Sequence, residues 1–271
     1  MRSCWILKST RLADLFYRWD VNPFFLVVLL VFLVPSSSFV VFSVVIGFEL
    51  LPSVVSTIIV FLVCSLVFFL YFHRNPKRDV VSDDRAVLSP ADGRIVYIKE
   101  IQQGTIIESV KKKKHMMLTE LLDIKDADSS SATGYIIGVE LRLFDVHITR
   151  APITGEKLLD HHVSGRIVSM GNPDFESIND RETVLLQKND HQMKSSAALC
   201  IAVVQIATFL TRTVKSYVRE KTRIMQGERL GMIRLGSQVD LVLYSTDVRI
   251  LVKEHDRVYA GVTKIAEITA P

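Results

Sequence analysis

The stretch GMIRLGSQVDLVL, residues 231–243, has the pattern of a β-strand, because most of its apolar residues alternate with polar ones. A glycine and a serine, Gly236 and Ser237, interrupt that pattern near its middle. Glycine inside a strand pattern commonly marks a bulge. The stretch therefore predicts a sheet-based fold, and its Gly-Ser pair requires an explanation.

Similar short runs continue on both sides of this stretch. Runs rich in Val, Ile and Tyr, such as RIVYIKEI, YIIGVELRLF and LCIAVVQIATFL, are separated by turn signals such as ADG, TGE and GNPD. No long segment after residue 80 shows a convincing helical period. We therefore predict a mainly β fold, a two-layer antiparallel sandwich or a flattened barrel.

The N-terminal part has a different composition. Between Val21 and Phe72 the only charged side chain is Glu49, and the two apolar runs on either side of it are each near the roughly 20 residues that cross a bilayer. Basic residues flank the outer ends of these runs, which predicts that both ends are cytoplasmic. A re-entrant turn at VPSSS, residues 34–38, is an alternative for the first run. We expect a multi-pass protein of the cell membrane with a cytoplasmic tail (1–21), a two-helix transmembrane hairpin (22–72) and a cytoplasmic domain (73–271).

Overall composition argues against several classes of protein. The chain has 271 residues, a net charge of +4 and no basic segment interleaved with aromatic residues, so nucleic acid is a poor partner. Its three cysteines have no paired spacing, and His161 and His162 are adjacent on a predicted strand and face opposite ways, so we expect no metal. The run Lys111–Lys114 is read as a solvated loop, with contact to anionic lipid headgroups as the alternative.

Four motifs carry the chemistry: FHRNPKR (72–78), SPADGRI (89–95), LFDVHITRAPITG (143–155) and GERLGMIRLGSQVDL (227–241). Each is weak alone, but their order and spacing together are specific. Over residues 74–271 the sequence resembles the phosphatidylserine decarboxylase family, in particular its shorter membrane-linked branch, which includes archaetidylserine decarboxylases.

The resemblance implies a cofactor that the chain makes from itself. In this family the serine of the Gly-Ser pair attacks the preceding carbonyl, the amide becomes an ester, and β-elimination leaves a pyruvoyl group. Carried over, cleavage falls between Gly236 and Ser237, and the chains 1–236 and 237–271 stay associated. The pyruvoyl group would form an imine with the headgroup of a membrane phospholipid, phosphatidylserine or archaetidylserine, and convert it to the ethanolamine lipid without a metal.

The same resemblance suggests which side chains assist. A serine hydroxyl needs an adjacent base, which we expect to be His147, oriented by Asp92 or by the rival carboxylate Asp145. His147 is also the candidate proton donor in decarboxylation, because imidazole titrates near neutral pH. Arg150 and Arg234 could bind phosphate or carboxylate through their planar forks, and structural pairing is an equal alternative for both.

Other readings stay open. The family usually has an Asn-Glu-Arg-type element where this chain has NDRETVLL, residues 179–186, which leaves a binding role for Asn179, Arg181 or Glu182 in doubt. Sandwich domains with DG turns also resemble lipoyl or biotinyl carrier modules, which bind and do not catalyse. An uncleaved relative that only binds lipid is a third hypothesis. Exposed sheet edges would favour pairing of two copies as a homodimer.

Overall fold

The computed structural model describes residues 41–42, 45, 47, 50–80, 82–102, 105–107, 116–117, 133–165, 179–188, 199–207, 214–233 and 237–269. The chain divides into two compact units, Met1–Tyr71 and Phe72–Pro271. Several predicted features lie outside the described residues: most of the first apolar run, Lys111–Lys114, Arg234 and Gly236.

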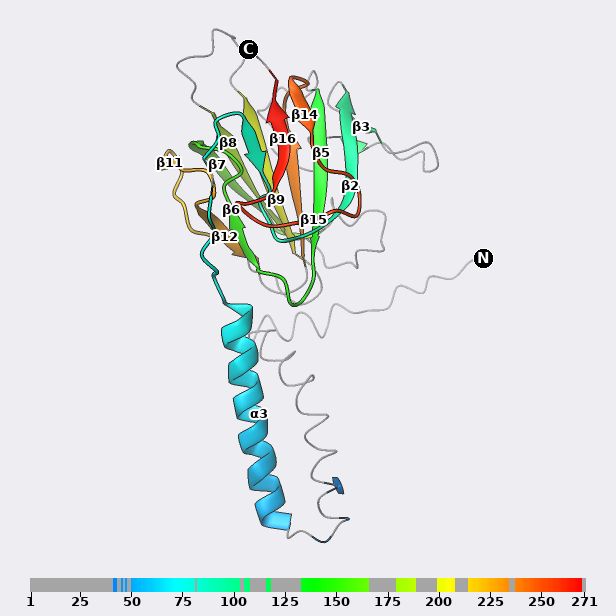
Figure 1. Cartoon of the computed structure of the whole chain (residues 1–271), viewed down its shortest axis with the longest axis vertical. Coiled ribbons are helices and arrows are strands. Elements are labelled where there is room, and N and C mark those ends of the chain that lie inside the picture. The colour runs from blue at the N-terminus through cyan, green and yellow to red at the C-terminus, as the bar shows by residue number, and fades with distance from the viewer. Residues whose placement is uncertain are drawn as a thin grey trace, which may run out of the picture. The chain divides into compact units, whose positions relative to one another are not determined.

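Helix α3, Leu50–Phe72, forms most of the second apolar run (Figure 1). Within it, Val54–Phe72 is long and apolar enough to cross a membrane, which is consistent with membrane association. In the described part of the chain this is the one helix that meets the criterion, so the structure shows one apolar helix, and the other helix of the expected hairpin lies almost wholly outside the described residues.

The second unit is built from antiparallel strands (Figure 1). Their bounds are β1 Ala86–Leu88, β2 Gly93–Gln102, β3 Thr105–Ile107, β4 Met116–Met117, β5 Gly134–Leu141, β6 Ile148–Arg150, β7 Gly155–Val163, β8 Arg181–Gln187, β9 Cys200–Ala207, β10 Val214–Ser216, β11 Arg223–Ile224, β12 Arg229–Ile233, β13 Ser237–Leu243, β14 Val248–Ile250, β15 Arg257–Val258 and β16 Lys264–Ile268.

A ten-stranded sheet forms the body of this unit, in the order β11-β7-β8-β9-β13-β5-β2-β3-β4, with β15 paired to β2. The sheet curls into a half-barrel, and two three-stranded sheets accompany it, β1-β16-β14 and β10-β12-β6. The prediction of a mainly β antiparallel fold is confirmed. The finer prediction was a two-layer sandwich or a flattened barrel, and the structure shows instead one long sheet curled into a half-barrel.

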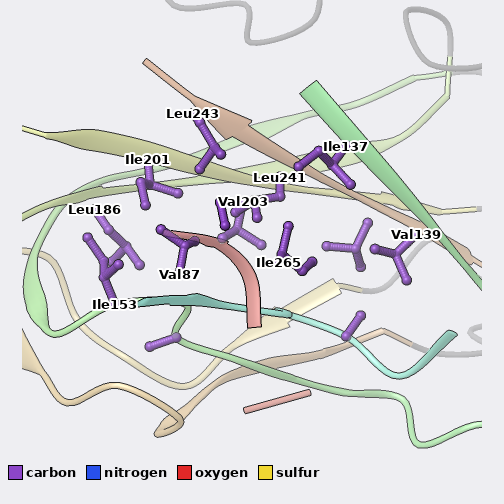
Figure 2. Close-up of a cluster of buried hydrophobic side chains, with 14 of the residues drawn as sticks. Val87, Ile137, Val139, Ile153, Leu186, Ile201, Val203, Leu241, Leu243 and Ile265 are labelled. Carbon is purple, nitrogen blue, oxygen red and sulfur yellow. The ribbon is translucent and has the colours of Figure 1, made fainter. Parts of the chain in front are cut away.

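The main core lies on one face of the ten-stranded sheet (Figure 2). Alternate residues of the central strands, among them Val139, Val203 and Leu241, point into it and are fully buried. Val87 of β1 and Ile265 of β16 close it from the other side. Because side chains alternate along a strand, Val204 and Val242 belong instead to a smaller cluster on the opposite face.

The stretch 231–243 is two strands and not one. Strand β12 ends at Ile233 and pairs with β6 and β10, whereas β13 begins at Ser237 and lies between β5 and β9 in the large sheet. The sequence pattern predicted a continuous strand because both halves are apolar and alternating. The structure places Ser237 at the first residue of β13, whereas Ile233, four residues earlier, ends a strand of a different sheet.

Candidate active site

The segment before β6 is held near Ile233 and Ser237, the described residues on either side of the predicted cleavage point. The backbone N–H of Ile233 donates to the carbonyl oxygen of His147 at 3.0 Å, which extends the pairing of β12 with β6 by one residue. On the other side of the cleavage point, Ser237 pairs with Leu141, the last residue of β5. The short loop from Leu141 to His147 therefore has its ends held next to both ends of the predicted cleavage segment.

His147 is fully buried, and its side chain has one hydrogen-bond partner in the described part of the chain. Its Nδ1 lies 2.9 Å from the carbonyl oxygen of Asp145. Because a carbonyl oxygen can only accept, Nδ1 carries the proton and the neutral ring keeps its lone pair on Nε2. Nε2 has no hydrogen-bond partner among the described residues. This tautomer is the one that a general base requires.

The ionisation of His147 differs from what the sequence led us to expect. Burial lowers its pKa from 6.5 to about 4, against the smaller opposing effect of the Asp145 hydrogen bond and charge. The aromatic ring of Phe72 contributes to that burial, since its centroid lies 4.3 Å from the imidazole centroid. His147 is therefore neutral at pH 7, which suits a base and does not provide the ready acid that we expected.

Asp92 is buried near the start of β2, but its carboxylate does not contact His147. One oxygen accepts the backbone N–H of Ala260 at 2.8 Å, and the other accepts Arg78 Nη2 at 2.7 Å. Asp92 is thus held by Arg78, and the backbone carbonyl of Asp145 orients His147 in its place. The expected Asp92–His147 hydrogen bond is not formed in the structure.

Gly93 follows Asp92 for a reason other than turn geometry. A Cβ at this position would lie 2.3 Å from the carbonyl oxygen of Glu140, far closer than real Cβ atoms approach. Gly93 does not have a positive φ, unlike Gly261, so the backbone conformation does not require glycine here. The Asp-Gly pair therefore lets β2 approach β5 closely and fixes the backbone that carries Asp92.

Asp145, the rival orienting carboxylate, is engaged elsewhere. Its side chain forms an ion pair with Arg257 and accepts the backbone N–H of Arg142 at 2.8 Å. Asp145 raises the pKa of Arg257, mainly through the hydrogen bond between the two side chains. The carboxylate thus anchors the loop, while the main-chain carbonyl of the same residue contacts the histidine.

Arg150, one of the two substrate-binding candidates, has protein partners in the structure. Nη1 donates to the Gly227 carbonyl at 2.9 Å, and Nη2 donates to Asn75 Oδ1 at 2.6 Å and to the Pro76 carbonyl at 3.3 Å. These bonds support structural pairing, the alternative that the sequence left open. The other candidate, Arg234, lies outside the described residues.

The segment Phe72–Arg78 has a larger part in the site than sequence reasoning gave it. Phe72 covers His147, Asn75 binds Arg150, and Arg78 binds Asp92. Arg74 Nη2 also donates to the carbonyl oxygen of Phe144 at 2.6 Å. The motif FHRNPKR was visible in the sequence, but the sequence did not show that Phe72 covers His147 while Asn75 and Arg78 bind Arg150 and Asp92.

The stretch 179–186 covers most of β8 and the two residues before it, and it contributes buried polar side chains between β7 and β9, with Glu182 opposite Gln205 of β9. Asn179 Nδ2 donates to the carbonyl oxygen of Ala207 at 2.8 Å, and Ala207 is the register partner of Ser237. Burial and a hydrogen bond with Asp160 raise the pKa of Glu182 to about 8. Within the described residues no group of three His, Cys, Asp or Glu side chains could hold a metal ion.

Comparison with known proteins identifies the family of the chain. The sequence profile of the phosphatidylserine decarboxylase family matches residues 66–266. A protein of Methanocaldococcus jannaschii described as an archaetidylserine decarboxylase proenzyme is 33% identical over 75% of this chain and 92% of its own length. The phosphatidylserine decarboxylase proenzyme of Carboxydothermus hydrogenoformans is 29% identical over 74% of this chain and 80% of its own length. The chain is therefore a member of the phosphatidylserine decarboxylase family.

Proposed function

We propose that this chain cleaves itself between Gly236 and Ser237 and then decarboxylates a serine-headgroup phospholipid, phosphatidylserine or archaetidylserine, to the ethanolamine lipid. The observation that carries the proposal is the buried lone pair on His147 Nε2, in a residue whose backbone is bonded to Ile233 beside the cleavage segment. The relatives named as proenzymes support self-cleavage, because a proenzyme becomes active only after processing.

In self-cleavage, His147 acts as the general base. It takes the proton of the Ser237 hydroxyl, whose oxygen then attacks the carbonyl carbon of Gly236. The C–N bond breaks, and the amine of residue 237 takes up the proton, so that an ester replaces the amide. Elimination removes the Cα proton of residue 237 and releases the Gly236 carboxylate. Water then displaces ammonia and leaves the pyruvoyl group.

The residues around the histidine keep it ready for this role. The Asp145 carbonyl fixes the tautomer, and Phe72 excludes water from the ring. Asp92 acts on the site from further away: its ion pair with Arg78 fixes the segment that carries Phe72. We propose this indirect positioning in place of the direct Asp92–His147 contact.

The residues present are compatible with a pyruvoyl group at position 237. Position 237 begins a central strand, close in the backbone pairing to the loop that holds the unpartnered His147 Nε2. When formed, the pyruvoyl carbonyl supplies a sink for the electron pair that carbon dioxide leaves behind. His147, once it has accepted a proton, returns one to the headgroup Cα. Attachment through the apolar helix α3 would keep the domain at the membrane that holds a lipid substrate, and we propose that it lies on the cytoplasmic face.

Denaturing mass spectrometry of the full chain, purified in detergent, tests the cleavage. We expect two fragments, 1–236 and 237–271, with the second lighter by one ammonia than the simple peptide. Both serine lipids are then supplied in mixed micelles, and formation of the ethanolamine lipid is measured. A Ser237→Ala variant is the control and should stay intact and inactive. An intact wild-type chain that still binds lipid would instead support the carrier or lipid-binding alternatives.

A further inference from the structure

We propose that Gln205 is a further catalytic residue of self-cleavage, whose side-chain amide donates a hydrogen bond to the carbonyl oxygen of Gly236 while Ser237 attacks it. This inference rests on the self-cleavage proposed above. It assigns a role to a polar residue in the middle of an otherwise apolar strand, β9.

Gln205 has one satisfied and one unsatisfied end. Its side chain is fully buried, and its Oε1 accepts the hydroxyl of Thr149 at 3.0 Å. Its Nε2, which carries two N–H donors, has no hydrogen-bond partner among the described residues. Leaving a buried donor without an acceptor destabilises a fold, so such a group needs an explanation. One explanation is that its acceptor becomes charged only during a reaction.

The strand register places Gln205 close to the cleavage point. Gln205 is opposite Val239 in β13, and Ala207, two residues further along β9, is opposite Ser237. Diagonal neighbours across a sheet are about 7–8 Å apart, within reach of a long side chain. Ile201 and Val203 alternate with the same period and point into the main core, so Gln205 lies on that same face.

The partner of Gln205 belongs to the other sheet. Thr149 is in β6, where it pairs with Gly231 of β12. The Thr149–Gln205 hydrogen bond therefore joins the sheet that the chain leaves at Ile233 to the sheet that it enters at Ser237. We call this region the junction, because Ile233 and Ser237 end and begin strands of the two sheets that it joins. His147 precedes Thr149 by two residues, so the proposed base and the proposed donor approach the junction together.

His147 and Gln205 would have different roles in the acyl shift. His147 Nε2 accepts the hydroxyl proton as the new C–O bond forms. The electron pair of the Gly236 carbonyl moves onto its oxygen, which then accepts the N–H of Gln205. When the tetrahedral centre collapses, the C–N bond breaks and the proton passes from His147 to the departing amine. A fixed donor in a dry site stabilises that oxygen far more than water would.

The first test is Gln205→Leu in the full chain, with the fraction cleaved followed over time after synthesis. We expect cleavage to slow by about 100- to 1000-fold, as for loss of one oxyanion donor. The melting temperature should stay the same or rise, because the substitution removes an unsatisfied donor. Gln187→Leu is the matched control: Gln187 ends β8 opposite Cys200, at the far end of β9, and its loss should leave cleavage unchanged.

The second test is the pH dependence of cleavage in Gln205→Glu. A purely structural role of Gln205 would not explain a cleavage rate that changes with pH in this variant. A protonated carboxyl group keeps one O–H donor, whereas the ionised form repels the developing oxyanion. Burial raises the pKa of a carboxyl group in this setting. Cleavage of this variant should be slow at about pH 8 and recover towards about pH 5, whereas Gln205→Leu should show no such recovery.

The outcomes separate the two proposals. If wild-type chain is cleaved and Gln205→Leu is cleaved at the same rate, the role of Gln205 is refuted and the proposed function stands. If Gln205→Leu does not fold, the Gln205→Glu profile decides, and slow cleavage at every pH refutes the role. If wild-type chain never cleaves, the proposed function fails, and the role of Gln205 fails with it.

Discussion

The ring of Phe72 lies against the ring of His147, with centroids 4.3 Å apart and planes inclined by 33°. Phe72 is 1% exposed and His147 is fully buried. Burial under an aromatic ring, away from water, strongly disfavours the charged form of an imidazole. Phe72, the last residue of the apolar helix, thus contributes to the burial that lowers the pKa of His147.

Replacement of Phe72 should change the pH dependence of self-cleavage. In the wild type, burial lowers the pKa of His147 to about 4, so the rate should stay level from neutral pH down to about 5 and halve near 4. Phe72→Ala admits water and moves that pKa up towards 6.5, so the half-point should rise with it. Rates are measured by gel densitometry across a pH series.

Two variants make this experiment specific. Phe72→Leu keeps an apolar cover and should retain most of the low half-point. Phe69→Ala, three residues earlier and 45% exposed, should leave the profile unchanged. An identical half-point in Phe72→Ala and wild type would show that Phe72 does not set the pKa of His147.

Loss of Arg78 should destabilise the domain and slow cleavage together. The ion pair of Arg78 with Asp92 is largely buried, with side chains 15% and 6% exposed. Removing one member of such a pair leaves a buried charge, at a cost of about 3 kcal/mol. We expect Arg78→Ala to lower the unfolding midpoint in urea, and Arg78→Lys to restore part of it.

An exposed pair provides the comparison. Arg249 and Glu267 form an ion pair with side chains 66% and 36% exposed, so Arg249→Ala should change the free energy of unfolding by less than about 1 kcal/mol. Equal changes in the free energy of unfolding for Arg78→Ala and Arg249→Ala would show that the Arg78–Asp92 pair stabilises the fold no more than an exposed pair does.

The sequence predicted the strands better than the path between them. Alternation in residues 237–243 and the Val- and Ile-rich run in residues 200–207 were enough to identify two strands. The same alternation continues through residues 229–233, and a two-residue period does not show that a chain has moved to another sheet. Thus a single strand was predicted where β12 and β13 are found.

In the candidate site, too, the sequence predicted part of what the structure shows. The motifs identified Asp92 and His147 as functional candidates, but contacts between distant segments decide what each one touches. Arg78 takes the Asp92 carboxylate, and a main-chain carbonyl orients His147. A sequence does not distinguish the carbonyl of Asp145 from its carboxylate. Nor did it mark Gln205, which reads as one polar residue in an apolar strand.

Glu182 should make the fold less stable as the pH rises. Burial and the Asp160 hydrogen bond raise its pKa to about 8 from 4.5, so between these values the folded chain holds a proton that the unfolded chain has lost. Unfolding then releases a proton, and stability present below about pH 4.5 is lost as the pH rises through 8. The melting temperature should fall between pH 5 and pH 9.

Glu182→Gln tests this assignment, because an amide can still donate to Asp160 but does not titrate. Its melting temperature should depend less on pH than that of the wild type, with the largest gain in stability near pH 9. Glu267→Gln, at a partly exposed carboxylate, is the control and should keep the wild-type slope. A Glu182→Gln slope equal to that of the wild type would contradict the raised pKa.

The two products of cleavage should remain one folded unit. Fragment 237–271 contributes β13 to β16, and their partners include β5, β9, β1 and β2 of the longer fragment. All seven residues of β13 pair on both sides, and Val239, Leu241 and Leu243 are fully buried. The fragments should therefore co-elute in size exclusion chromatography without denaturant.

Unfolding of the cleaved protein should nevertheless depend on its concentration, because two chains separate when the sheet opens. Diluting the sample tenfold should lower the denaturation midpoint of the cleaved wild type. The uncleaved Ser237→Ala chain has the same strands joined covalently, so its midpoint should not move. Fragments that separate on a native column would show that the sheet pairing of β13 does not hold them. A midpoint independent of concentration in the cleaved protein would mean that unfolding leaves the two chains together.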